Sequence, residues 1–111
     1  MKTNRTKEQL IKYVTEEVRH NEKMCKIANN DYDIDYWDAR AIIAQNILDE
    51  LNKDTNFHIE RYLNSVMRKG HAEVKQEADD FWNENQFESV TFRGYIDEYE
   101  ILFMIFRQEY C

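Results

Sequence analysis

Proline is absent from this chain of 111 residues, and glycine occurs only at Gly70 and Gly94. A phosphate-binding loop built on several glycines is therefore excluded, because such loops need glycine where the backbone approaches the phosphate. No Pro-rich or Gly-rich linker, repeat or low-complexity segment interrupts the sequence. We therefore predict a single compact domain covering residues 1–111, a length that suits one hydrophobic core.

Cysteine is also scarce: Cys25 and Cys111 are too few and too far apart for a disulfide framework or a zinc site. The longest apolar run, residues 101–106, falls well short of the roughly 18 residues that a membrane span needs. The first residues are not followed by the apolar stretch of a secretory signal. We expect a cytoplasmic protein without membrane contact.

Positive charge is in short supply beyond the first 30 residues. That segment carries seven Lys or Arg against four acidic residues, whereas residues 31–60 have a net charge of −6 and residues 61–111 one of −4. The whole chain has a formal net charge of −7. Phosphate backbones repel such a surface, so direct nucleic-acid binding is disfavoured and a protein partner with a basic surface is favoured.

Two helices are predicted in the first half of the chain from apolar residues spaced three and four apart. Thr6 and Gln9 have the spacing of a capping box, so the first helix should begin there and end near residues 29–30. Asp35 is the expected N-cap of a second helix from about Tyr36 to Asn52.

A third helix is predicted after a cap at Asp54 or Thr55, with an apolar stripe that continues to Trp82. Gly70 falls on that stripe. It either lets another helix approach closely or splits the segment in two, because glycine costs about 1 kcal/mol in a helix interior relative to alanine.

The C-terminal residues follow a different pattern. Apolar residues alternate with others over 90–96, and residues 99–106 are largely apolar or aromatic. This pattern favours two strands joined near residues 97–98, the second buried on both faces. The predicted fold class is therefore α+β and mainly helical, with three to four α-helices followed by a C-terminal β-hairpin. The alternative is an all-α bundle with a C-terminal helix from Tyr95 to Tyr110.

Two motifs resemble metal sites, but each lacks an essential part. His71-Ala72-Glu73 has the H-x-E form of zinc deaminases, yet the chain has no proline and no paired cysteines to complete that signature. The Asp-x-Asp-x-Asp pattern of residues 31–35 resembles an EF-hand loop, but Tyr36 and Ile42 stand where that loop needs glycine and a bidentate glutamate. We therefore predict no catalytic site, no metal and no cofactor.

Acidic residues interleaved with aromatics form the remaining candidate site. Carboxylates on a rigid surface can imitate a phosphate track, and exposed Tyr or Trp can anchor an interface. The alternative is that the aromatics fill the core while the acids keep the surface solvated. The candidate partner-binding residues are Asp31, Asp33, Asp35, Tyr36, Trp37, Asp38, Asp79, Asp80, Trp82, Glu84, Glu88, Asp97 and Glu98.

In general character, a short acidic chain with the segments Asp31–Asp38 and Asp79–Trp82 resembles small phage-encoded proteins that disable host defence, anti-CRISPR proteins among them. That resemblance implies stoichiometric inhibition without chemistry. The protein would bind a nucleic-acid-handling protein such as a CRISPR-Cas nuclease, in the cytoplasm of a bacterial host, and block its nucleic-acid binding or its conformational change.

A second hypothesis concerns the basic first helix. A small helical regulator or assembly subunit, which could be a homodimer, would use this helix to contact nucleic acid or an acidic partner. The residues concerned are Lys2, Arg5, Lys7, Lys12, Arg19, Lys23 and Lys26.

Overall fold

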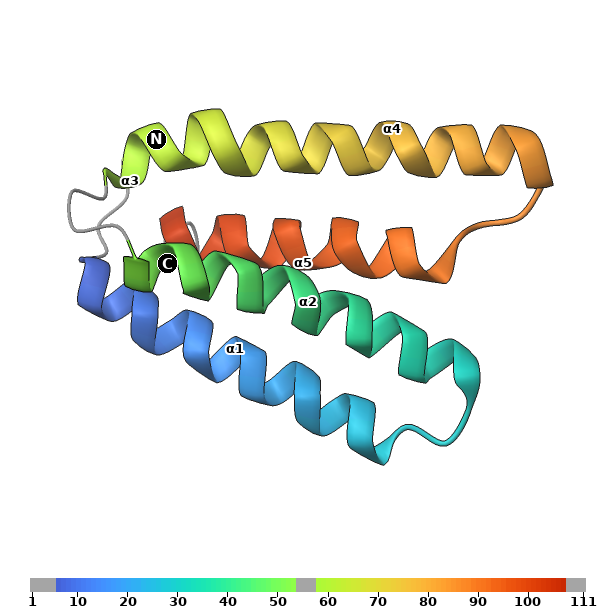
Figure 1. Cartoon of the computed structure of the whole chain (residues 1–111), viewed down its shortest axis with the longest axis horizontal. Coiled ribbons are helices and arrows are strands. Elements are labelled where there is room, and N and C mark those ends of the chain that lie inside the picture. The colour runs from blue at the N-terminus through green and yellow to red at the C-terminus, as the bar shows by residue number, and fades with distance from the viewer. Residues whose placement is uncertain (1–5, 54–57, 108–111) are drawn as a thin grey trace.

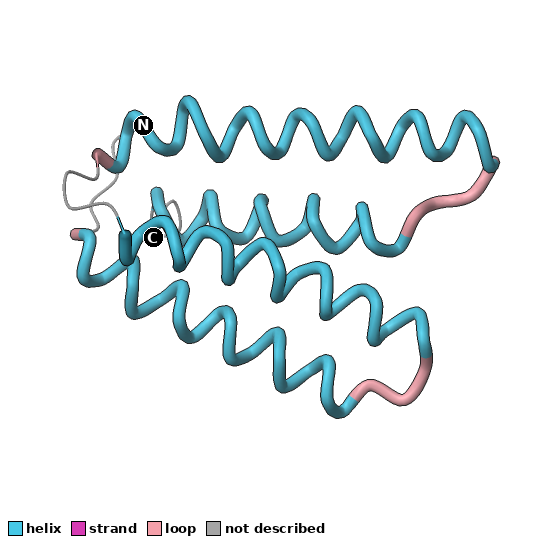
Figure 2. The backbone as a smooth tube through the Cα atoms, viewed as in Figure 1, coloured by secondary structure: helices cyan, strands magenta, loops and turns pink. Residues whose placement is uncertain are grey.

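The computed structural model describes residues 6–53 and 58–107, and these ranges are helical apart from short connections. Helix α1 covers Lys7–Ile27, α2 covers Asp31–Lys53 and α5 covers Val90–Arg107. Between α2 and α5, three segments follow one another without a break as one long helix. They are α3 (Ile59–Tyr62), the π-helical turn η1 (Leu63–Met67) and α4 (Arg68–Asn85). Figures 1 and 2 show α5 lying between α4 and the α1–α2 pair.

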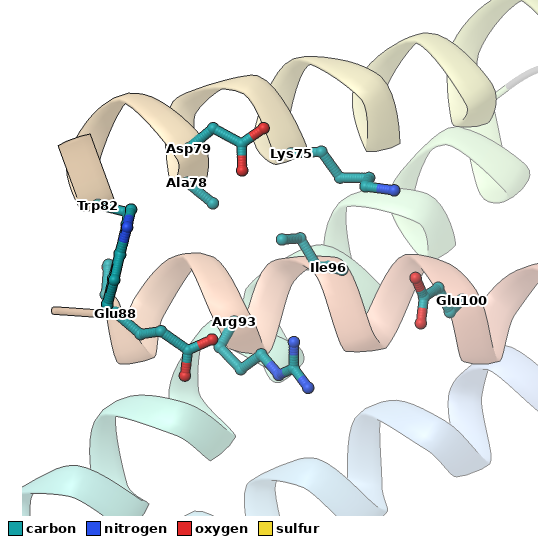
Figure 3. Close-up of a pocket in the computed structure, with 9 residues that line it drawn as sticks. Lys75, Ala78, Asp79, Trp82, Glu88, Arg93, Ile96 and Glu100 are labelled. Atoms are coloured by element: carbon teal, nitrogen blue, oxygen red, sulfur yellow. The ribbon is translucent and has the colours of Figure 1, made fainter. Parts of the chain in front are cut away.

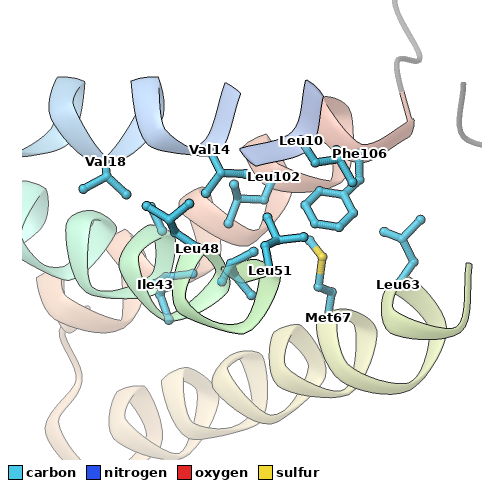
Figure 4. Close-up of a cluster of buried hydrophobic side chains, with 12 residues drawn as sticks. Leu10, Val14, Val18, Ile43, Leu48, Leu51, Leu63, Met67, Leu102 and Phe106 are labelled. Atoms are coloured by element: carbon cyan, nitrogen blue, oxygen red, sulfur yellow. The ribbon is translucent and has the colours of Figure 1, made fainter. Parts of the chain in front are cut away.

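The hydrophobic core lies where α1, α2, α5 and η1 meet (Figure 4). Leu102 and Phe106 of α5 are fully buried there, and burying a side chain of this size contributes roughly 1.5–3 kcal/mol to folding. The core residues are Leu10, Val14, Val18, Ile43, Ala44, Ile47, Leu48, Leu51, Leu63, Met67, Leu102 and Phe106.

Helix α1 begins as the sequence predicts, whereas α2 begins earlier. The Thr6 hydroxyl accepts a hydrogen bond from the Gln9 amide, and the Gln9 side chain accepts one from the Thr6 amide. Asp35 is not the N-cap of α2, because the Asn30 side chain accepts a hydrogen bond from the Asp33 amide at 2.8 Å and the helix starts at Asp31. An asparagine caps a helix as well as an aspartate does. Because the cap lies earlier, α2 is more than one turn longer at its N-terminus than predicted.

The predicted C-terminal β-hairpin is wrong, and the all-α alternative is correct for the residues described: α5 is one helix and no strand occurs among them. The cause is that α5 packs on two sides, against α4 through Phe92 and Phe103 and against the core through Leu102 and Phe106. A helix buried on two sides is apolar around most of its circumference, so its sequence loses the helical period.

The third helix also differs in its details. Its described part begins after His58, whose ring nitrogen accepts a hydrogen bond from the Arg61 amide, and the proposed caps Asp54 and Thr55 lie outside the described residues. Gly70 does not split this long helix. A Cβ at that position would lie 2.5 Å from the Tyr99 hydroxyl, so the absence of a side chain allows α5 to pack closely.

Gly94 marks a second close approach, between α5 and the start of α2. A Cβ on Gly94 would lie 2.7 Å from the Tyr36 carbonyl oxygen and 2.8 Å from the Ala39 Cβ. The two helices therefore contact each other through backbone at this point. Among the described helices, none combines the length and the apolar character needed to cross a membrane.

Candidate functional site

The α1–α2 connection and the α4–α5 connection lie at the same end of the molecule (Figure 1). The contact of Gly94 with Tyr36 joins the two regions. Two acidic clusters that are more than 40 residues apart in sequence are thus brought to one end of the bundle. We call this the acidic end and define it by its exposed acids, Asp31, Asp35, Asp38, Asp79, Asp80, Glu84 and Glu88.

Carboxylates outnumber cations at the acidic end, although cations are present. Lys23 and Lys26 in the last turns of α1 are exposed, and so is Arg93 in the first turn of α5. Arg93 lies 3.6 Å from the Asp97 carboxylate, which neutralises part of its charge. The acidic end therefore has a net negative potential that is broken by a few positive positions.

Exposed aromatic side chains accompany these acids. Tyr32 is 60% exposed, Trp82 47% and Phe87 58%. The Phe87 ring packs edge to face against the Phe81 ring with 5.3 Å between the ring centroids, and this contact ties the α4–α5 connection to α4. Trp82 and Phe87 flank the end of α4, and exposed aromatic rings of this kind can anchor a partner.

Four of the predicted binding residues, Tyr36, Trp37, Asp97 and Glu98, instead belong to an internal network centred on Arg40. Its Nε donates to Glu98 Oε1 at 2.8 Å and its Nη2 donates to Glu17 Oε1 at 3.1 Å, so one guanidinium joins α1, α2 and α5. The same guanidinium lies 4.4 Å from the centroid of the Trp37 ring. Glu98, which was predicted to contact a partner, has a fully buried side chain and is not part of the surface in this structure.

Tyr36 and Asp97 belong to the same network. The Tyr36 hydroxyl donates to the Asp97 carboxylate at 2.6 Å, and burial together with this acceptor raises the pKa of the Tyr36 hydroxyl. Asp33 is held by Asn30, whose side-chain amide donates to the Asp33 carboxylate at 2.9 Å. Tyr36, Trp37, Asp33 and Asp97 are each only partly exposed, so their main contacts are internal.

Burial raises the pKa of the Glu98 carboxyl well above its ordinary value. The hydrogen bond from Arg40 opposes this shift, and the neighbouring Glu17 carboxylate adds to it. Two carboxylates thus share one guanidinium in a buried site, so a proton on Glu98 is favoured because it removes the excess negative charge.

A groove of about 680 Å³ lies between α4 and α5 beside the acidic end (Figure 3). Ala78 and Ile96 provide apolar surface on its two sides, and the Trp82 ring stands across one end, reaching from α4 toward Glu88. Asp79 lines the groove from α4. Grooves of this size that combine apolar surface with a few charged groups are typical of binding sites.

The ions along the groove differ in how they are paired. Glu100 Oε2 lies 3.2 Å from His71 Nε2, and Arg93 lies near Asp97. Within residues 6–53 and 58–107, by contrast, no ion pair holds Asp79 or Glu88. These two carboxylates at the Trp82 end are available for an incoming cation.

The resemblance of His71-Ala72-Glu73 to a metal motif has no counterpart in the fold. His71 faces α5, where its ring packs edge-on against Phe103 with 5.6 Å between centroids. Among the residues that the structure describes, no group of three or more His, Cys, Asp or Glu side chains is arranged to hold a metal ion.

Arg40 and the groove were not identified by the sequence reasoning. A signal for Arg40 was present, because it lies on the same helical stripe as Ile43, Ile47 and Leu51. A lone arginine on an apolar stripe indicates a buried partner of opposite charge. The groove had no such signal, because its two sides come from segments that were predicted to be a helix and a strand.

Comparison with known proteins finds no matching family model, no matching curated protein and no matching solved structure. The residues described above are therefore the basis on which a function is assigned.

Proposed function

We propose that this protein is a non-enzymatic inhibitor or modulator that binds a nucleic-acid-handling protein, such as a CRISPR-Cas nuclease, through its acidic end. The observation that carries the proposal is the collection of exposed carboxylates and exposed aromatics from two distant segments at one end of the bundle. The proposed setting is the cytoplasm, where such partners act on nucleic acid.

Electrostatics supplies the first step of this proposal. A protein that handles nucleic acid has Lys and Arg arranged to contact phosphate oxygens, and carboxylates on a rigid helix present a comparable row of negative charge. Glu73, Glu77, Asp80 and Glu84 recur at intervals of four, three and four along α4 and are all exposed, so they form one acidic stripe leading to the acidic end. Attraction between such surfaces speeds the encounter and selects the partner.

Aromatic contacts supply the second step. Trp82 and Phe87 are partly exposed at the end of α4, and burying such rings at the centre of an interface gives most of the binding energy in typical complexes. The carboxylates around them would then exclude competing acidic surfaces. Binding of this kind blocks the partner's own nucleic-acid site without any reaction.

The proposal is tested by affinity capture from a bacterial lysate, followed by direct binding of the recovered protein in purified form. The two test variants are Asp80→Lys/Glu84→Lys on α4 and Asp35→Lys/Asp38→Lys on α2. The matched control is Glu16→Lys/Glu50→Lys, which changes two exposed acids outside the acidic end by the same total charge. We expect the α4 variant to lose capture of a basic nucleic-acid-binding protein while the control retains it.

The recovered protein should be displaced by its own DNA or RNA if the acidic end occupies the nucleic-acid site. Equal binding by the α4 variant, the α2 variant and the control would refute a role for the acidic end.

A second candidate function follows from a separate feature of α1. The side chains of Lys12, Arg19, Lys23 and Lys26 are exposed and recur at intervals of seven, four and three residues, which places them on one face of the helix. Lys2 and Arg5 lie outside the described residues. A regulator that contacts nucleic acid through this face would bind duplex or single strands with a strong salt dependence. Absence of binding at low salt would remove this candidate.

A further inference from the structure

We propose that the Trp82 end of the groove between α4 and α5 is a receptacle for one arginine side chain of a protein partner. This inference rests on the proposed function, because it names the contact that a basic partner would make at the same end of the molecule. The guanidinium would stack on the Trp82 ring and donate hydrogen bonds to the carboxylates of Asp79 and Glu88.

The position of the Trp82 ring is the first argument. Its ring crosses from α4 toward Glu88 and so closes one end of the groove, with Ala78 and Ile96 beside it (Figure 3). Almost half of its surface is accessible to solvent. A planar guanidinium stacks favourably on an indole, and its aliphatic stem fits an apolar floor.

The charges at this end are the second argument. Asp79 comes from α4 and Glu88 from the α4–α5 connection, so a cation entering between them meets carboxylates from both sides. Neither is held by an ion pair with another described residue, whereas Glu100 Oε2 farther along the groove lies 3.2 Å from His71 Nε2. Lys75 lies toward that other end, and Arg93, which also lines the groove, lies 3.6 Å from the Asp97 carboxylate.

The chemistry of the occupant is the third argument. A guanidinium offers several donors in one plane and can bond two carboxylates while it stacks on a ring. An ammonium group is a compact, strongly hydrated charge, so it is less suited than a guanidinium to stack on a ring and bond two carboxylates at once. Arginines that normally contact phosphate are also the side chains that an acidic mimic must engage.

The same protein already contains this arrangement once. Arg40 lies 4.4 Å from the centroid of the Trp37 ring while it bonds Glu98 and Glu17. The Trp82 end offers a partner the same three groups, a tryptophan face and two carboxylates, on the surface.

The experiment is a titration of the intact protein with three short peptides of identical length that carry one arginine, one lysine or one citrulline. Nuclear magnetic resonance follows the indole N–H signals of Trp37 and Trp82 separately, since the chain has two tryptophans. We expect the arginine peptide to shift the Trp82 signal and leave the Trp37 signal in place. The lysine peptide should bind several-fold more weakly, and citrulline, which keeps the shape without the charge, should not bind.

Variants locate the contact. We expect Trp82→Leu to lower the affinity for the arginine peptide about tenfold. Asp79→Asn/Glu88→Gln should lower this affinity by a similar factor. Glu84→Gln is the matched control, because Glu84 is an exposed acid on the same helix that does not line the groove. Thermal unfolding of each variant confirms that it remains folded. Equal binding of arginine and citrulline peptides, or an equal loss in Glu84→Gln, would overturn the inference.

The two proposals fail in different ways. If the arginine peptide binds at Trp82 but lysate capture recovers no nucleic-acid-handling protein, the receptacle stands and the proposed function is wrong. If such a protein is captured through the α4 acids but the three peptides are not distinguished, the proposed function stands and the receptacle is wrong.

Discussion

Arg40 Nε lies 2.8 Å from Glu98 Oε1 at the junction of α2 and α5, and both side chains are almost entirely removed from solvent. Because Arg40 also bonds Glu17, this one guanidinium fixes three helices relative to one another. It therefore determines how the start of α5 sits against α2, and with it where the α4–α5 connection is placed.

Replacing Arg40 by methionine should lower the free energy of unfolding by about 3 kcal/mol, because it leaves the Glu17 carboxylate without its counter-ion and the buried Glu98 carboxyl without its hydrogen-bond donor. Denaturant unfolding measures this change. Glu16→Gln is the control, since Glu16 is an exposed acid in the middle of α1, and it should change stability by less than about 0.5 kcal/mol. Equal stability of the Arg40→Met variant and the wild type would show that the network does not hold the helices.

The stability should depend on pH through Glu98. Its pKa in the folded chain is raised from 4.5 to about 8, so the folded chain binds this proton more tightly than the unfolded chain does. The resulting stabilisation is fully present below pH 4.5 and is lost as the pH rises through about 8. Glu98→Gln keeps an acceptor for Arg40 without a titrating proton, so its stability relative to wild type should increase between pH 5 and pH 8, by at most roughly 1.4 kcal/mol per pH unit. Unfolding curves at several pH values measure the difference, and Glu84→Gln, an exposed acid, should show none. A constant difference between Glu98→Gln and wild type across that range would contradict the assignment.

The two glycines should respond differently to alanine. In Gly94→Ala the new Cβ meets the Tyr36 carbonyl oxygen and the Ala39 Cβ, which cannot move without shifting a helix, so we expect a loss of roughly 1–3 kcal/mol. In Gly70→Ala it meets the tip of the Tyr99 side chain, which can shift, and alanine gains about 1 kcal/mol in helix propensity. Gly70→Ala should therefore stay within about 1 kcal/mol of wild type. Thermal and denaturant unfolding compare the pair, and a larger loss at Gly70 would reverse this ranking.

Tyr36→Phe should separate internal contacts from partner contacts. The substitution removes the hydroxyl that donates to Asp97, so the free energy of unfolding should fall by about 1 kcal/mol. Capture of the partner should be unchanged, because the ring and the exposed acids remain. A variant that unfolds like wild type but captures less partner would place Tyr36 in the interface.

The helical character of the chain could be predicted from its sequence, and the reasons are local. The capping box at Thr6 and the apolar stripe of α1 depend only on residues a few positions apart. The secondary structure of α5 could not be predicted in this way. Its apolar residues face α4 on one side and the core on the other, and this two-sided burial depends on tertiary packing. Asp35 and Asn30 are both good capping residues, and the structure uses Asn30, whose side chain accepts a hydrogen bond from the Asp33 amide.

The candidate site could be predicted only in part. The sequence identifies acids and aromatics in clusters but carries no sign of which clusters are exposed. Tyr36, Trp37 and Glu98 look like the exposed residues in composition, yet each of them contacts Arg40. Asp97 accepts a hydrogen bond from the Tyr36 hydroxyl. Only the helix packing separates Glu98 from Glu88, which lies ten residues earlier and is exposed.

The core described above is completed by α5, and this has a consequence during synthesis on the ribosome. Leu102 and Phe106 pack against the core residues of α1 and α2, and that pair emerges first with its apolar faces uncovered. Exposed apolar faces on a nascent chain recruit chaperones or aggregate until they are buried. Stable folding therefore waits until residue 106 has been made, and a premature stop before α5 would yield a polypeptide without a closed core.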